Sequence, residues 1–120
     1  MRQFEIIRKA CLNVASAETA CWPDIYKKTK VKSPLFLHCA AVATVVQAIF
    51  GGEIVTGRVN GVSHYWNRLP DGIEVDLTSC QFGGDGFTPF KKGRKVKRRK
   101  LTNLRFLLFA QRVLENLRVD

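Results

Sequence analysis

The sequence predicts a single α+β domain in which helices come first and a small antiparallel sheet follows. The chain has 120 residues, of which 46% are hydrophobic and 25% charged, as is typical of one folded domain with one core. Apolar residues recur at helical spacing up to residue 50 and with the alternation of strands after it. Because the two patterns do not alternate along the chain, they favour an α+β over an α/β arrangement.

Two helices are expected in the first part of the chain. The first covers residues 4–17, where apolar residues recur at helical spacing: Phe4, Ile7, Cys11, Val14 and Ala15. Residues 18–34 are less regular. Residues 35–50 are almost wholly apolar, are too long for one strand, and end at Gly51-Gly52, a typical helix stop. They predict a buried central helix that starts close to Leu37 and packs on the sheet.

Three strands are expected after the glycine pair, because polar and apolar residues alternate there. They cover residues 53–59, 62–69 and 72–77. Pro70-Asp71-Gly72 is a strong turn signal between the last two. Residues 81–89 are expected to form a glycine-rich loop, and residues 101–117 a closing amphipathic helix. The predicted apolar side of that helix consists of Leu104, Leu107, Leu108, Val113 and Leu114.

Cysteine usage predicts a cytoplasmic protein with reduced thiols. The four cysteines include no CxxC pair, and charged residues interrupt the apolar stretch that a secretory leader would need. They are Cys11, Cys21, Cys39 and Cys80. A zinc site would have to use His38, Cys39, His64 and Cys80, whose spacing matches no structural finger, so we expect no metal and no cofactor. No apolar run reaches the ~18 residues that a membrane span requires, so we expect no membrane contact.

The positive charge of the chain is concentrated in one segment. Twenty Lys and Arg against ten Asp and Glu give a net charge of +10. Eight of the ten residues from 91 to 100, called the basic segment here, are basic: Lys91, Lys92, Arg94, Lys95, Lys97, Arg98, Arg99 and Lys100. Such a run is either a solvated loop or a surface for nucleic acid, for an acidic protein or for an anionic substrate. It contains no base-reading motif, so it would bind nucleic acid through phosphates.

Cys39 is the first candidate for chemistry, because it lies near the start of the predicted central helix. A helix N-terminus carries roughly half a positive charge, which stabilises a thiolate and lowers a cysteine pKa from about 8.5. The alternative is that Cys39 is a small buried apolar residue in an apolar helix. Its position does not decide between the two.

His64 and Asp76 lie on the two arms of the predicted hairpin, and the loop length determines whether they share a face. A three-residue loop pairs Leu69 with Ile73 and sets Asp76 diagonal to His64, and a five-residue loop sets the two directly opposite. Loops of two or four residues place them on opposite faces. Loops of odd length that end in glycine are common, which favours an imidazole–carboxylate pair.

Together these residues allow a nucleophile at a helix start, a base on a strand and a carboxylate that orients the base. Each residue also has a structural interpretation: a half-buried histidine is often part of the core, and an aspartate near a strand end often caps a turn. The combination of Cys39, His64 and Asp76 within 38 residues raises the weight of the catalytic interpretation.

His64-Tyr65-Trp66 followed by Asp76-Leu77-Thr78 resembles the His-x-Trp…Asp-x-Thr pattern of transglutaminase-like and other papain-like cysteine enzymes. The resemblance is closer to the small bacterial YunG-type domain. The matching stretches, between residues 10 and 90, are Ala17-Glu18-Thr19, Trp22, His38-Cys39-Ala40-Ala41-Val42, Val46-Gln47, Gly51-Gly52-Glu53-Ile54, His64-Tyr65-Trp66-Asn67-Arg68-Leu69 and Asp71-Gly72-Ile73-Glu74-Val75-Asp76-Leu77-Thr78 with Gln81-Phe82.

This resemblance implies a papain-like α+β fold with Cys39 as nucleophile, His64 as base and Asp76 as orienting group, and it implies no particular substrate. In one departure, Leu37-His38 stands where Gly-Gln is expected before the cysteine. His38 would then either offer a ring N–H to the oxyanion, or only cap the helix or face solvent. Trp22 and Trp66 are expected in the core, with Trp66 packed beside the helix that carries the cysteine.

Two classes of function follow. The first is a thiol enzyme that transfers an acyl group from a protein or peptide-like substrate to water, as a peptidase or deamidase, or to an amine, as a transglutaminase does. The second is a non-catalytic basic protein on the same fold that grips nucleic acid or a protein assembly, as a phage or mobile-element inhibitor would. The sequence does not predict the oligomeric state.

Overall fold

The computed structural model describes residues 2–29, 35–96 and 104–119. In order, the elements are α1 (Arg2–Val14), α2 (Pro23–Lys28), α3 (Cys39–Phe50), β1 (Glu53–Val59), β2 (Val62–Arg68), β3 (Glu74–Val75), the 3-10 helix η1 (Ser79–Phe82), β4 (Arg94–Lys95) and α4 (Leu104–Val119). The strands form one antiparallel sheet of order β3-β2-β1-β4, which confirms the α+β class. None of the helices within these residues is long and apolar enough to cross a membrane.

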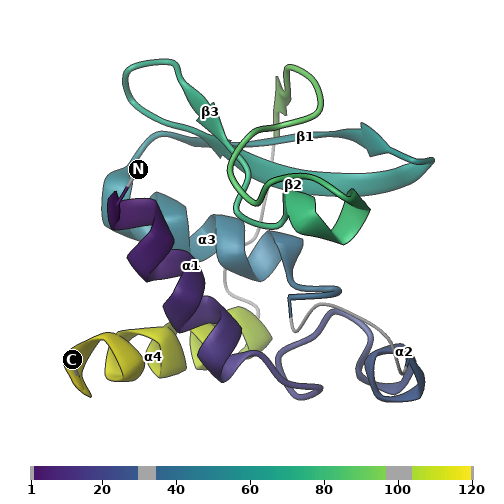
Figure 1. Cartoon of the computed structure of the whole chain (residues 1–120), viewed down its shortest axis with the longest axis vertical. Helices are drawn as coiled ribbons and strands as arrows, with labels where there is room; N and C mark the ends of the chain where they lie inside the picture. The colour runs from purple at the N-terminus through teal and green to yellow at the C-terminus, as the bar shows by residue number, and fades with distance from the viewer. Residues whose placement is uncertain (1, 30–34, 97–103, 120) are drawn as a thin grey trace.

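The helix α3 lies between the sheet and the other long helices. Figure 1 shows the sheet as one layer, α3 along one side of it, and α1 and α4 crossing on the far side of α3. The core lies where these helices meet. At one end of α3, the rings of Phe4 and Phe50 are 4.7 Å apart. At the other end, Phe109 of α4 packs against His38 with ring centroids 5.3 Å apart. The start of α3 is thus fixed in the interior.

The two faces of β2 carry different partners. Asn67 Nδ2 donates to the backbone carbonyl of Ala43 in α3 at 2.9 Å, so α3 covers the face to which Asn67 points. His64 and Trp66 alternate with Asn67 along the strand and point to the other face. Within the described residues, β3 pairs only with Asn67 and Arg68, so the edge of β2 at His64 has no strand beside it.

Several strand and helix bounds differ from the expectation. The first two strands are confirmed, but the third is only two residues long, because the backbone N–H of Asp76 donates to the carbonyl of Phe87 instead of to β2. The expected loop 81–89 overlaps the helix η1, and α2 forms in the segment that showed no regular pattern. The basic segment contributes β4, which pairs with β1 at Val55 and Thr56.

The predicted apolar side of α4 is confirmed at Val113 and is wrong at most of its other positions. The structure buries Phe106, Phe109 and Val113, whereas Leu104 is 80% exposed. Leu107 and Leu114 are also exposed, and Leu108 is half-buried. The helix is rotated so that the two large rings enter the core, since burying an aromatic ring removes more apolar surface from water than burying a leucine.

Trp22 is not in the core either, for its side chain is 58% exposed. It is the residue before α2, and it precedes Pro23, which begins that helix. The backbone of Trp22 is extended there, as is usual before a proline, and this places its ring outside the packed layers.

Candidate functional site

The hairpin between β2 and β3 has the three-residue loop, one of the two loop lengths expected to place His64 and Asp76 on the same face. Leu69 N–H donates to the carbonyl of Ile73 at 2.8 Å, and the pairing continues with Arg68 opposite Glu74. One step past β3, this register sets Asp76 across from Trp66 and diagonal to His64 on the same face. The loop length therefore brings the carboxylate to the imidazole.

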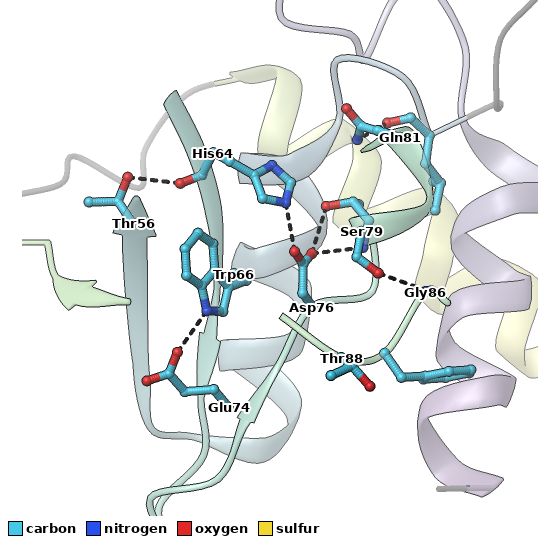
Figure 2. A network of polar contacts seen from close by, with 12 residues as sticks. Thr56, His64, Trp66, Glu74, Asp76, Ser79, Gln81, Gly86 and Thr88 are labelled. Carbon is cyan, nitrogen blue, oxygen red and sulfur yellow. Dashed lines mark hydrogen bonds and ion pairs between the residues drawn. The ribbon is translucent and has the colours of Figure 1, made fainter. Parts of the chain in front are cut away.

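His64 lies between the other two candidate catalytic residues. Its Nε2 is 2.7 Å from Oδ2 of Asp76, and both side chains are only 1% exposed (Figure 2). The ring is also hydrogen-bonded to the side chain of Cys39, the first residue of α3. Because Nε2 faces Asp76, the ring nitrogen available to the thiol is Nδ1. The structure thus brings Cys39, His64 and Asp76 together in that order.

The neighbours of His64 favour its protonated form. Burial of the ring disfavours the imidazolium and by itself lowers the pKa. The hydrogen bonds with Asp76 and Cys39, and the electrostatic interactions with both side chains, outweigh burial and raise the pKa of His64 from 6.5 to about 9. At neutral pH the ring therefore carries a proton between a carboxylate and a sulfur atom.

Asp76 is oriented by the segment that follows β3. Its Oδ1 accepts hydrogen bonds from the backbone N–H of Thr78 at 3.0 Å and from the Thr78 hydroxyl at 3.1 Å. Oδ2 is then left to accept from His64. Thr78 is thus a positioning residue. The sequence analysis gave it no role, although it is part of the Asp-x-Thr pattern.

Two aromatic rings pack against the His64 imidazole. The ring of Trp66 lies 5.6 Å away at an interplanar angle of 32°, and the ring of Phe82 lies 4.9 Å away at 82°. Trp66 is buried as expected, but on the face of β2 away from α3, where its Nε1 donates to Glu74 at 2.8 Å (Figure 2). The two rings shield the imidazole from water. Phe82 could have been found only through the Gln81-Phe82 stretch of the resemblance.

A network of charges holds Trp66 and the following loop in place. Glu74 accepts hydrogen bonds from Trp66 Nε1, from the Gly93 backbone N–H and from Arg68, whose guanidinium also donates to the Gly93 carbonyl. Burial raises the pKa of Glu74, but these hydrogen bonds outweigh it and hold the pKa below its usual range. The carboxylate therefore stays ionised and joins β2, β3 and the start of β4.

His38 has a role that neither sequence alternative described. Its ring is fully buried between Tyr26 and Phe109, and it makes no side-chain cap to α3. Nδ1 donates to the carbonyl of Phe36 at 2.8 Å, and Nε2 is 2.7 Å from the hydroxyl of Thr19. Burial lowers the pKa of the ring. Both nitrogens are engaged, so the ring has no N–H to offer to an oxyanion.

No group of three His, Cys, Asp or Glu residues that could hold a metal ion occurs within the described part of the chain. All four cysteines lie in that part, and they form no disulfide. Cys11 is buried in α1, which raises the pKa of its thiol to about 12. Cys21 is exposed, and Cys39 and Cys80 are half-buried.

Half of the basic residues in the basic segment lie among the described residues. Lys91, Lys92, Arg94 and Lys95 are exposed. Lys95 forms an ion pair with Glu53 at 3.3 Å. The remaining basic residues of the segment, Lys97, Arg98, Arg99 and Lys100, lie outside the described residues.

The pH dependence of stability is expected to carry the signature of His64. Its folded pKa of about 9 exceeds the ordinary value of 6.5, so protonated His64 stabilises the fold below about pH 6.5, and this contribution is lost as the pH rises through about 9. A shift of this size corresponds to roughly 3 kcal/mol. Urea denaturation near neutral and alkaline pH should show a larger loss of unfolding free energy in the wild type than in His64→Gln. Equal losses would show that His64 is not held protonated by the fold.

The fold and the site define a small α+β protein in which a buried carboxylate, an imidazole and a thiol are in contact. The chain belongs to the YunG family, since the family model described as YunG protein matches residues 3–118. This match confirms the resemblance to the YunG-type domain. Comparisons with curated proteins and with solved structures returned no significant match.

Proposed function

We propose that this protein is a cysteine-dependent acyl-transfer enzyme of papain-like or transglutaminase-like type. One observation carries the proposal: the His64 imidazole bonds the buried carboxylate of Asp76 through Nε2 and is also hydrogen-bonded to Cys39, the first residue of α3. A structural histidine needs one such partner, whereas a catalytic one needs both, because the carboxylate orients the ring that serves the nucleophile.

In the first step, the sulfur of Cys39 bonds to the carbonyl carbon of the substrate, and the carbonyl π electrons move to oxygen. When this intermediate collapses, the bond from carbon to the leaving amine breaks and the amine takes the proton from His64. A thioester on Cys39 and a neutral His64 remain. Water or a second amine then attacks the thioester and gives its proton to His64. The carbon–sulfur bond breaks, and the acid or the new amide is released.

The oxyanion would be stabilised by the backbone at the start of α3. The first N–H groups of a helix have no intrahelical acceptor and point along the positive end of the helix dipole. Cys39 is itself the first residue of the helix, so its own N–H is next to the reacting sulfur. Since the His38 ring nitrogens already have partners, this backbone group is the donor that the site offers.

Acylation by p-nitrophenyl acetate tests the proposal. We expect a burst of nitrophenolate with one acetyl group on Cys39, found by peptide mapping, and a rate above that of the exposed Cys21 by at least about tenfold. Cys39→Ser should remove the burst, and the matched variant Cys21→Ser should keep it. Adding methylamine then separates hydrolysis from transfer. If Cys39 is acetylated no faster than Cys21, the proposed enzyme activity is contradicted and the alternative of a non-catalytic binding protein remains.

A further inference from the structure

The start of the basic segment lies on the same face of the sheet as His64. Gly57 of β1 pairs directly with His64 of β2, so side chains at the two positions point to one face. A Cβ at Gly57 would lie 2.9 Å from Cη2 of Trp66 and 3.4 Å from Cδ of Lys91. The aliphatic part of the Lys91 side chain therefore lies over Gly57, the residue paired with His64, and beside the edge of the Trp66 ring.

Aromatic rings connect the same loop to the imidazole. Phe82 packs edge-on against His64 at 4.9 Å, and Phe90 packs edge-on against Phe82 at 6.3 Å. Phe90 is 49% exposed, so part of its ring is open to a ligand. Lys91 follows Phe90 directly. An apolar surface and a cation thus adjoin each other next to the candidate base.

The loop is held firmly in this position. The backbone N–H of Gly93 donates to Glu74 at 2.8 Å, and its carbonyl accepts from Arg68 at 2.7 Å. A Cβ at Gly93 would lie 2.4 Å from Val55 Cγ2 and 3.0 Å from Trp66, so the absence of a side chain permits this close approach. The backbone of Lys91 and Lys92, which directly precedes Gly93, is therefore held against the sheet.

The cations at this site exceed the carboxylates that could neutralise them. Lys91, Lys92 and Arg94 are exposed and have no acidic partner among the residues that the structure describes. The nearby carboxylates already have partners: Asp76 bonds His64, and Glu74 and Glu53 bond Arg68. Asp85, earlier in the same loop, bonds Phe87 and Thr88 and offsets at most one of the three cations, so the surface beside the site keeps a net positive charge.

We infer that the substrate of this site is an acidic peptide segment, with Lys91 contacting a carboxylate and Phe90 an apolar side chain close to the acyl group. The inference rests on the proposed function. A peptide is favoured over nucleic acid because the adjoining thiol and imidazole act on a carbonyl, which a peptide offers along its whole backbone.

Charged thiol reagents test the inference directly. Sulfonatoethyl methanethiosulfonate is an anion and trimethylammonioethyl methanethiosulfonate is a cation. In both, the thiolate attacks the sulfenyl sulfur, a disulfide forms and methanesulfinate leaves, so no oxidant is needed. Peptide mapping gives the rate at Cys39 and, as an internal reference, at the exposed Cys21. The measured quantity is the anion-to-cation rate ratio at Cys39 divided by that at Cys21.

We expect this normalised ratio to exceed unity in the wild type and to fall about fivefold in Lys91→Glu at low ionic strength, where the screening length grows to about 30 Å at roughly 0.01 M salt. Arg118→Glu makes the same change in net charge in the last turn of α4, on the side of the molecule away from the sheet, and should leave the ratio unchanged (Figure 1). Phe90→Ala should slow a benzyl methanethiosulfonate more than the methyl reagent.

The outcomes separate this inference from the proposed function. If Lys91→Glu leaves the ratio unchanged while the burst of acylation persists, the inference of an acidic peptide substrate is overturned and the proposed enzyme activity stands. If the ratio falls as expected but Cys39 is not acylated, the result supports anion binding beside Cys39 and contradicts the proposed enzyme activity. Salt-dependent binding of single-stranded DNA that requires Lys91, with a ratio at Cys39 equal to that at Cys21, would overturn the inference in favour of nucleic acid.

Discussion

Replacing His64 by alanine is expected to lower the rate of Cys39 alkylation by iodoacetamide near pH 6 by about 10- to 100-fold. The thiolate is the form that reacts, and the protonated His64 ring, with its pKa raised to about 9, provides the positive charge and the hydrogen bond beside it. Alanine removes both. The rate is measured from about pH 4 to pH 9 by mass spectrometry of the peptide that contains Cys39.

Two references make this measurement specific. Cys21 is exposed in the same molecule and should react at the same rate in both proteins. Asp76→Asn keeps a hydrogen-bond acceptor for His64 but removes the charge that helps to hold its proton, so it should slow alkylation by less than the loss of the ring. A Cys39 whose pH profile is the same with and without His64 would refute an activated cysteine–histidine pair.

Replacing Trp66 by alanine is expected to lower the free energy of unfolding by about 3–5 kcal/mol, the usual cost of deleting a buried tryptophan. Its ring is 2% exposed, packs against His64 and fills the space that Gly57 and Gly93 leave open. The deletion leaves a cavity and also deprives Glu74 of a donor. Urea denaturation of the two proteins measures the loss.

Trp66→Phe is the matched variant for this prediction. It keeps an aromatic ring against His64 and loses the N–H that donates to Glu74, so it should cost about 1.5–3 kcal/mol, the usual contribution of one hydrogen bond to a charged group. A cost for Trp66→Ala no larger than that for Trp66→Phe would mean that ring packing contributes little to stability.

The features of the fold that depend on local pattern could be predicted from the sequence. The alternation from Glu53 to Val59 gave a strand with the bounds that the structure shows, and Gly51-Gly52 marked the end of α3. The turn Pro70-Asp71-Gly72 left a few loop lengths, two of which join His64 and Asp76, and the structure contains the shorter of those two. Turn residues and the periodicity of apolar residues are local features, so they can be recognised in a single sequence.

The features that depend on tertiary packing could not be predicted. Several apolar stripes run along α4, and only contact with α1 and α3 selects the one that contains Phe109. In the same way, nothing local to His38 shows that Thr19 and the Phe36 carbonyl occupy its ring. The pairing of Arg94 and Lys95 with β1 depends on Gly93, whose close approach to Val55 is visible only in three dimensions.

The hairpin loop of three residues has a consequence for how this gene can vary. Loops are ordinarily the places where insertions and deletions accumulate without harm. An insertion between Leu69 and Ile73 only lengthens this loop, because the pair that closes it and the residues beyond that pair keep their faces. A gain or loss of one residue between Ile73 and Asp76 would instead turn Asp76 to the opposite face from His64. Descendants of this sequence that keep the imidazole–carboxylate pair should therefore vary in the length of the loop but not in the spacing from Ile73 to Asp76.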